Sequence, residues 1–404
     1  MDVNLNKLSI DKSNWKLIKF GDVASEPKEN VKDLLGEGIE HVVGLEHINS
    51  EDIHLRRSVN IETSTTFNKK FAKGDVLFGR RRAYLKKVAQ APFSGICSGD
   101  ITVFRAKDSI LPELLPFIVC NDKFFDFAVK HSAGGLSPRV KFKDLANYQF
   151  LLPPKDQQKQ LAELLWAMDD VIEKERMLLE KLKILKNRKK ELFFIKGNKQ
   201  KNLKSFFSYK VPNNWEIKKM SDIANVEYGI SESVANNTDP KIGWPIITSA
   251  NIELDGSFNL DKKRYIEIPS NERFLLKLGD LLFNWRSGSP EHIGKTAFFN
   301  LNQDYTYASF ILRIRCGNEI KNRFLYYLLN YLREIEFFTK NIAQQVNFKI
   351  NASIFREVEV PVPPINEQEN MLKELELLFE QEQIIKSKLT SSQALQKSLI
   401  NQIF

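Results

Sequence analysis

Two long stretches of the chain repeat apolar residues at alternating steps of three and four. The first begins near position 156 and the second near 366, and each continues without a proline. This spacing places apolar side chains along one stripe of an α-helix, and about 40 residues of helix span roughly 60 Å. Two such helices most simply pack against each other as a coiled coil. The alternative is that each helix covers only its own half of the chain.

The remainder of the chain is an internal duplication. Four landmarks recur in the same order, with separations that grow from 200 to 210 positions. Diverged copies with loop insertions produce this kind of drift. The landmarks are an Asn-Trp pair (14–15, 214–215), an Asp-Val/Ile-Ala segment (22–24, 222–224), a Gly-Asp pair before an apolar run (74–78, 279–283) and an apolar run closed by two prolines (150–154, 360–364).

Short β-rich runs alternate with helical runs inside each copy, which predicts an α+β fold. We therefore expect two globular domains in tandem, each followed by a long helix. The predicted boundaries are 1–155 for the first domain, 156–196 for the central helix, 197–214 for a polar linker, 215–365 for the second domain and 366–404 for the C-terminal helix.

Composition narrows the class of protein. The 404 residues are 42% hydrophobic, and no apolar run approaches the ~18 residues of a membrane span. The start of the chain has no signal-peptide pattern, and the three cysteines form no CxxC pair, so we expect a cytoplasmic protein. The net charge of +9 suggests a polyanionic partner. A Lys/Arg-rich segment at 181–204 is either a solvated face or a phosphate-facing end of the first helix.

No catalytic or metal-binding constellation is evident. The segment 288–296 has five residues between its glycines where a phosphate loop needs four. The proline pairs lack the polar and aromatic neighbours of an adenine methyltransferase loop. His41, His47 and His54 lack the spacing of a metal site. The Gly-Asp pairs are best interpreted as turns that feed strands.

Each half instead contains two polar segments suited to DNA. Arginine can bind guanine or phosphate bidentately, amides can read adenine, and aromatic rings can stack on bases. In the first half the candidate DNA-binding residues are Arg80, Arg81, Arg82, Tyr84, Lys86, Lys87, Ser137, Arg139, Lys141 and Lys143. In the second half they are Asn284, Trp285, Arg286, Ser287, Lys295, Gln344, Gln345, Asn347 and Lys349. No catalytic and no metal-ligating residue is predicted.

This pattern resembles the specificity subunit of type I restriction–modification enzymes, and the resemblance extends over essentially the whole chain. No single motif is strong, but the order and duplication of the motifs are specific. The residues that carry it are Trp15, Trp215, the two Gly-Asp-apolar segments, Ile293-Gly294-Lys295, Gln345-Val346-Asn347 and the stretches 153–158 and 363–368.

The resemblance implies a non-catalytic, DNA-reading subunit. Each globular block is then a target-recognition domain for one half of a bipartite, asymmetric duplex site. The two helices pack antiparallel with pseudo-twofold symmetry, set the spacing of the half-sites and dock two methyltransferase (M) subunits. Motor–nuclease (R) subunits complete the assembly. The partner subunits carry S-adenosylmethionine, ATP and magnesium, and this chain binds no cofactor.

Two other classes of protein stay open. A free-standing DNA-modifying enzyme, either a methyltransferase or a nuclease, needs a cofactor-binding glycine motif or a carboxylate cluster, and the sequence contains neither. A coiled-coil scaffold without a nucleic-acid role does not account for the basic segments that recur in both halves.

Overall fold

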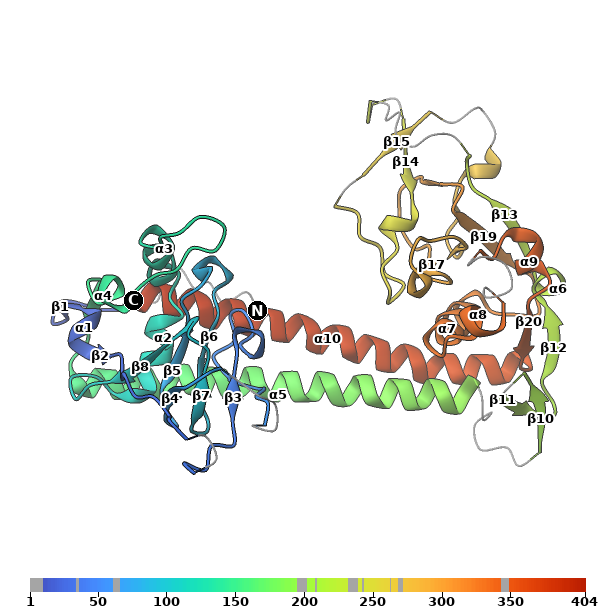
Figure 1. Ribbon diagram of the computed structural model, residues 1–404. Coiled ribbons are helices and arrows are strands. Elements are labelled where there is room, and N and C mark those ends of the chain that lie inside the picture. Colours follow the sequence, from blue (N-terminus) through green and yellow to red (C-terminus); the bar gives the residue numbers. More distant parts are fainter. Residues whose placement is uncertain are drawn as a thin grey trace. The chain divides into compact units, whose positions relative to one another are not determined.

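The computed structural model describes residues 10–33, 36–60, 66–194, 202–207, 209–231, 239–241, 243–261, 263–267, 272–342 and 349–404 (Figure 1). The chain divides into two compact units. Unit 1 comprises Met1–Leu178 together with Ile385–Phe404, and unit 2 comprises Leu179–Ile384. In the part of the chain described, no helix is both long and apolar enough to cross a bilayer.

Unit 1 is built on small sheets with short helices beside them. A four-stranded antiparallel sheet has the order β2-β8-β5-β6, and a three-stranded sheet, in which β3 and β7 are parallel, has the order β3-β7-β4. The strands are β1 (Lys16–Lys19), β2 (Ala24–Ser25), β3 (Val42–Val43), β4 (Lys69–Phe71), β5 (Val76–Gly79), β6 (Val88–Gln90), β7 (Gly95–Cys97), β8 (Ile101–Ala106) and β9 (Gln149–Leu152). The short helices are α1 (Phe20–Val23), α2 (Leu115–Val119), α3 (Asp122–Lys130) and α4 (Phe142–Leu145).

Unit 2 repeats this plan. Its four-stranded sheet has the order β13-β19-β16-β17, and its three-stranded sheet has the order β15-β14-β18. The strands are β10 (Leu203–Phe206), β11 (Tyr209–Pro212), β12 (Glu216–Lys219), β13 (Ala224–Tyr228), β14 (Trp244–Ile247), β15 (Tyr265–Ile266), β16 (Leu281–Asn284), β17 (Thr296–Phe298), β18 (Thr306–Tyr307), β19 (Ile311–Cys316) and β20 (Glu359–Val362). The short helices are α6 (Met220–Ile223), α7 (Asn322–Glu334), α8 (Phe337–Asn341) and α9 (Ala352–Arg356).

The matching order of strands and helices in the two units confirms the predicted internal duplication and the α+β class. Strand β1 pairs antiparallel with β9, the last strand of unit 1, and β12 pairs in the same way with β20, the last strand of unit 2. The connector predicted at 197–214 contains, among its described residues, the hairpin of β10 and β11. This hairpin packs on unit 2 through Phe206, whose ring lies 5.8 Å from that of Phe337.

The Gly-Asp pair before β5 forms a turn. Gly74 has a φ of +90°, which side chains with a Cβ rarely adopt. The carboxylate of Asp75 accepts the backbone N–H of Ala72 at 2.7 Å and binds the guanidinium of Arg105 at 2.8 and 2.9 Å. These contacts confirm the interpretation of the pair as a turn that feeds a strand. Unit 2 has the same turn. Gly279 has a positive φ, and Asp280 accepts the N–H of Lys277 and binds the guanidinium of Arg315.

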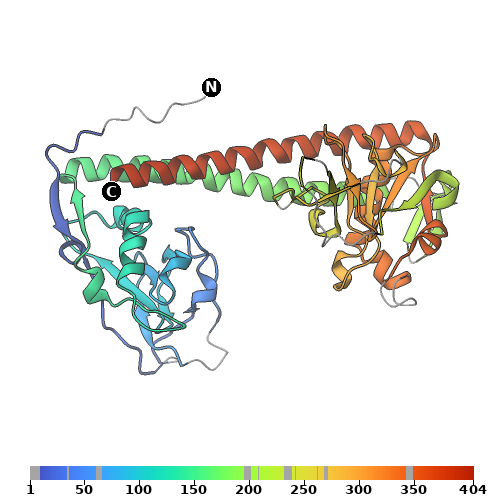
Figure 2. The same cartoon turned by 90° about the horizontal axis from the view of Figure 1, so that it is seen from above.

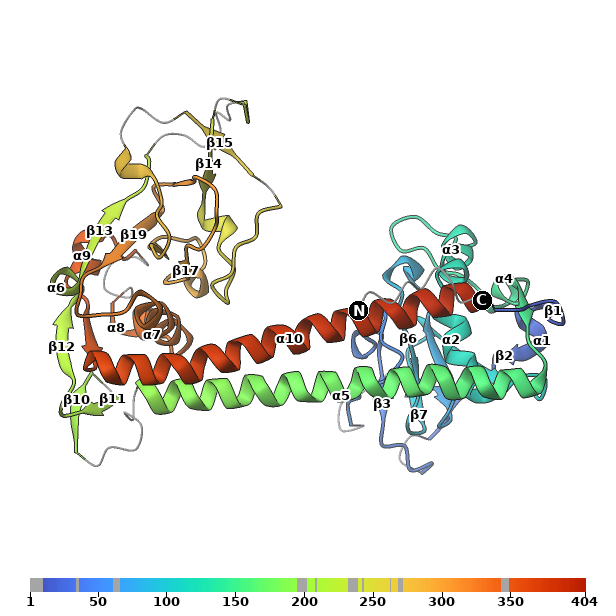
Figure 3. The ribbon, with the colours of Figure 1, turned by 180° about the vertical axis from the view of Figure 1, so that it is seen from behind.

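Two long helices follow the proline pairs. Strand β9 leads into α5 (Lys155–Phe194), and β20 leads into α10 (Ile365–Ile403) (Figures 2 and 3). In unit 1, Gln396 of α10 donates to the carbonyl of Leu165 on α5 at 3.2 Å. In unit 2 the ion pairs Lys186–Glu382 and Lys189–Glu374 join the same two helices. In unit 2 the residue numbers rise on α5 as they fall on α10, so the two helices pair antiparallel there.

Each long helix contributes to both hydrophobic cores, which excludes the alternative that a helix covers only its own half. The end of α5 is buried in unit 2, where the ring of Phe194 lies 5.5 Å from that of Phe324. The end of α10 is buried in unit 1, where the ring of Phe404 lies 6.2 Å from that of Phe150. The core of unit 1 therefore includes the last residues of the chain.

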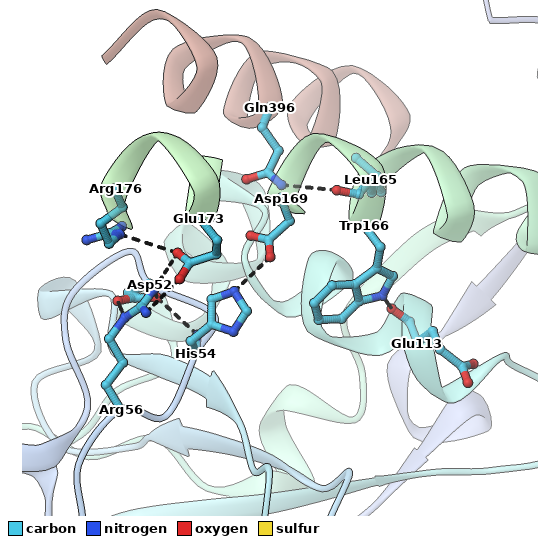
Figure 4. Close-up of polar contacts among 10 residues, drawn as sticks. All are labelled: Asp52, His54, Arg56, Glu113, Leu165, Trp166, Asp169, Glu173, Arg176 and Gln396. Atoms are coloured by element: carbon cyan, nitrogen blue, oxygen red, sulfur yellow. Dashed lines mark hydrogen bonds and ion pairs between the residues drawn. The ribbon is translucent and has the colours of Figure 1, made fainter. Parts of the chain in front are cut away.

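A polar network fastens one loop of unit 1 to α5 (Figure 4). His54 hydrogen bonds through Nε2 to Asp169 at 2.7 Å, and Arg56 binds Glu173 at 2.6 and 2.8 Å. Arg56 also binds Asp52 at 2.6 Å, which orients the guanidinium from its other side. The hydrogen bond to Asp169 raises the pKa of His54 above its usual value despite the opposing effect of burial. His54 is thus part of the loop attachment.

Candidate nucleic-acid interface

The two basic segments predicted in the first half lie side by side. They are residues 80–87, after β5, and residues 137–143, before and within α4. Their backbones meet in an antiparallel bridge between Arg81 and Arg139. The backbone N–H of Arg82 also donates to a carbonyl of the second segment at 2.8 Å. Residues more than 50 positions apart therefore form one surface of unit 1.

A carboxylate lies between the two bridged arginines. Asp100 accepts hydrogen bonds from Nη1 of Arg81 at 3.2 Å and from Nε of Arg139 at 2.7 Å. Arg81 also donates through Nη2 to the hydroxyl of Ser137 at 3.0 Å. Partial burial raises the pKa of Asp100, but the hydrogen bonds from the two arginines outweigh that effect and hold it below its usual value. Asp100 is therefore an anionic anchor for both guanidinium groups.

The other candidates of unit 1 differ in their surroundings. Lys86 forms an ion pair with Asp122 at 2.5 Å, and Lys87 donates to the carbonyl of Leu45 at 2.6 Å. These two ammonium groups have partners inside the unit. The exposed candidates are Arg82, Tyr84, Arg139, Lys141 and Lys143, while Arg80, Arg81 and Ser137 are partly buried.

Unit 2 brings its two predicted segments together in the same way. Arg286, after β16, forms an antiparallel bridge with Lys349, which precedes α9. The N–H of Ile350 donates to the carbonyl of Trp285 at 3.0 Å. Both Arg286 and Lys349 are exposed, while Ser287 is partly buried and accepts the N–H of Ser289 at 3.3 Å. The candidates Gln344, Gln345 and Asn347 lie outside the described residues.

Aromatic side chains surround this second bridge. The indole N–H of Trp285 donates to the carbonyl of Ser309 at 2.7 Å, and its ring packs edge-to-face against Tyr228 and Phe310. The guanidinium carbon of Arg286 lies 5.1 Å from the centre of the Phe310 ring. Phe310 is 44% exposed, so the surface of unit 2 combines an arginine with open aromatic area.

Two candidates of unit 2 have structural partners instead. Asn284 is 1% exposed, and its amide donates to the carbonyl of His292 at 2.8 Å. Lys295 is 6% exposed and donates to the carbonyls of Ser249 and Ile252 at 2.9 and 2.6 Å. Burial lowers the pKa of Lys295. Neither side chain is presented to an external ligand, and we leave both out of the proposed DNA-contacting set.

Sequence reasoning missed the residues that support these surfaces. Asp100 and Phe310 each precede an apolar strand, β8 and β19, and lie outside the basic segments in sequence. Alignment of the two halves places Asp100 and Phe310 at the same position. The carbonyl of Asp100 accepts the N–H of Arg80, the residue after β5, and the carbonyl of Phe310 accepts the N–H of Trp285, the residue after β16. That alignment is the signal that could have identified them.

A duplicated α+β unit with a bridged pair of polar segments, joined to its copy by paired long helices, defines the class of this protein. Residues 12–184 and 212–391 match the family model described as the type I restriction modification DNA specificity domain. The chain belongs to this family.

Known relatives agree with this assignment, and a solved structure shares the fold. The chain is 29% identical over 182 residues to the type I restriction enzyme MjaX specificity subunit of Methanocaldococcus jannaschii, covering 43% of this chain and 42% of that one. It is 26% identical over 243 residues to the MjaIX specificity subunit of the same organism, covering 56% and 55%. The matches thus span about half the length of these curated relatives. The type I restriction-modification S subunit from M. genitalium has the same fold, with a TM-score of 0.60 at 13% identity over 100% of this chain and 98% of the other.

Proposed function

We propose that this chain is the DNA-specificity subunit of a type I restriction–modification complex. Each unit reads one half of a bipartite duplex site and catalyses no reaction itself. The observation that carries the proposal is the pair of bridges, Arg81 with Arg139 and Arg286 with Lys349, at equivalent places in the two units. Both bridges present cationic side chains, which suit the phosphates and base edges of duplex DNA.

The two halves of the site differ in sequence under this proposal. Unit 1 surrounds its bridge with charged groups, and unit 2 surrounds its bridge with aromatic rings. Two surfaces of different chemistry do not select the same bases, so the target is asymmetric rather than palindromic.

In this proposal the long helices set the spacing of the two half-sites and bind the partner subunits. Here α5 and α10, which each extend from one unit into the other, set the separation of the half-sites. Their exposed apolar side chains provide docking surfaces for two methyltransferase subunits, to which motor–nuclease subunits are added. S-adenosylmethionine, ATP and magnesium then belong to those partners, and the assembly works in the cytoplasm. The large apolar residues exposed on α5 and α10 are Leu164, Val171, Met177, Leu178, Ile184, Leu185, Leu377 and Ile384.

Binding of the full-length chain, with its methyltransferase subunits, to a library of duplexes tests the proposal. We expect a bipartite motif whose binding is lost when a few base pairs are inserted between its halves. Arg81→Ala should relax selection in one half and Trp285→Ala in the other, by roughly ten-fold or more. Adenine methylation by the chain alone, or enrichment of no motif, contradicts the proposal. An unchanged motif in both variants excludes these two segments as the reading surface.

A further inference from the structure

The Asp100 cluster of unit 1 has two partly exposed arginines on one fixed carboxylate. The side chains of Arg81 and Arg139 are 38% and 47% exposed, while that of Asp100 is 22% exposed. The backbone holds Asp100 in place, because its N–H donates to the hydroxyl of Ser98 at 3.2 Å and its carbonyl accepts the N–H of Arg80 at 3.0 Å. Both guanidinium groups are therefore oriented before any ligand arrives.

The hydrogen bonds within the cluster leave part of each guanidinium for a ligand. Arg139 binds Asp100 through Nε, which leaves its two terminal amino groups for an external acceptor. Such a planar fork matches the O6 and N7 acceptors that guanine presents in the major groove. Phosphate also accepts from arginine, so the fork alone does not distinguish a base contact from a backbone contact.

The carboxylate itself argues against a phosphate contact. A surface that only binds phosphate gains from each positive charge and loses from each negative one. Asp100 places a negative charge between two arginines, which weakens their attraction to the DNA backbone. Its benefit is orientation, and orientation matters for a base edge with two fixed acceptors far more than for a phosphate.

Unit 2 shows that the fold does not require this carboxylate. The position of Asp100 is occupied there by Phe310, whose carbonyl accepts the N–H of Trp285 at 3.2 Å. Arg286, the counterpart of Arg81, lies over the ring of Phe310 instead of binding a carboxylate. The same backbone therefore accommodates an aromatic residue, so the fold itself does not call for an acidic residue at this position.

We propose that Asp100 is a positioning residue that holds Arg81 and Arg139 to read guanine in the half-site bound by unit 1. This inference rests on the proposed function, because it names the base class selected by one of the two units. The arginines contact the base edges, and Asp100 acts through them. The half-site bound by unit 2 is read without such a pair.

Selection from randomised duplexes by the full chain with its methyltransferase subunits, followed by sequencing, tests this inference. Wild-type protein should enrich a motif with guanine at one or more positions of one half-site. Arg139→Lys keeps the charge and removes the fork, so it should lower that guanine preference about ten-fold and change binding to non-specific DNA little. Asp100→Asn should lower the same preference and strengthen non-specific binding, because it removes a negative charge. Asp100→Glu should restore part of the preference.

The second half-site is the internal reference, and Lys73→Ala, at an exposed position of unit 1 outside the cluster, is the control variant. The base preference at the second half-site should stay the same in every variant, and Lys73→Ala should change the preference at neither half-site. These two results separate a positioning role from a general loss of folding. A wild-type motif without guanine in either half-site overturns the inference. So does an unchanged guanine preference in Arg139→Lys and Asp100→Asn, which is the result for phosphate contacts. Enrichment of no motif by wild-type protein instead overturns the proposed function.

Discussion

The side-chain oxygen of Gln158 accepts a hydrogen bond from the backbone N–H of Leu111 at 3.0 Å. Its amide nitrogen donates to the carbonyl of Pro153 at 3.0 Å, so one buried side chain ties the start of α5 to a loop of unit 1. Gln368 repeats this arrangement in unit 2, where it accepts the N–H of Lys321 at 2.8 Å and donates to the carbonyl of Pro363 at 2.8 Å. The glutamine four positions after each proline pair thus joins a globular unit to its helix.

Replacement of this glutamine should weaken the junction. Gln158→Ala removes the partner of a part-buried N–H and of a buried carbonyl, so we expect unit 1 to lose about 2–3 kcal/mol of unfolding free energy. Denaturant unfolding of the full chain measures this loss. Gln160→Ala, an exposed position on the same helix, is the control and should change stability little. Equal effects of the two substitutions contradict a specific role for Gln158.

The chain end inside unit 1 gives a second prediction. Ile403 is fully buried there, and Ile403→Ala should cost about 2–5 kcal/mol, the usual range for truncation of a buried isoleucine. Hydrogen exchange followed by mass spectrometry should show that the substitution speeds up exchange, relative to wild type, in peptides of unit 1 more than in peptides of unit 2. Gln402→Ala, which alters an exposed neighbour, is the control. An equal increase of the exchange rate in both units, or no increase in unit 1, contradicts the prediction.

The attachment of the loop to α5 should depend on pH. The pKa of His54 is raised in the folded chain, so the stabilising contribution of the His54–Asp169 pair is complete below the unfolded pKa of about 6.5. It is lost as the pH rises through the folded pKa. Asp169→Asn should therefore lower the melting temperature more at about pH 5.5 than at about pH 8.5. The exposed substitution Glu163→Gln is the reference, and a loss independent of pH argues against a charged His54.

The thiols should be unreactive in the folded chain. Burial raises the pKa of Cys97 and of Cys316 to about 12, and it raises the pKa of Cys120 as well. Thiolate is the reactive form, so a disulfide reagent at pH 8 should label none of the three in native protein and all three after unfolding. Rapid labelling of any cysteine under native conditions contradicts this burial.

The sequence predicted the parts of the fold that depend on local pattern. The three–four spacing gave both long helices, and the paired landmarks gave the duplication. The hairpin of β10 and β11 was missed, because a polar, lysine-rich segment resembles a linker, and only the structure shows that Phe206 packs on Phe337. The contribution of each helix to both cores was also missed, since it arises from residues far apart in the chain.

The candidate surface was predicted in the same uneven way. Clusters of basic residues are visible in sequence, and the structure joins them in each unit through the bridge of Arg81 and Arg139 or of Arg286 and Lys349. Burial is not visible in sequence, which is why Lys295 resembled a candidate for DNA contact. Its partners are carbonyls more than 40 positions earlier in the chain. Asp100 and Phe310 were missed because they act on residues from other segments.

Unit 1 is discontinuous in sequence, since unit 2 is inserted between its two parts. During synthesis, the residues of unit 2 are therefore complete before the last 20 residues of unit 1 have been translated, because those residues begin at Ile385. Until then the nascent first unit lacks Ile403 and Phe404, and the apolar surface that they cover stays open. The first unit to be translated is thus the last to close, and during this interval its open apolar surface is prone to aggregation.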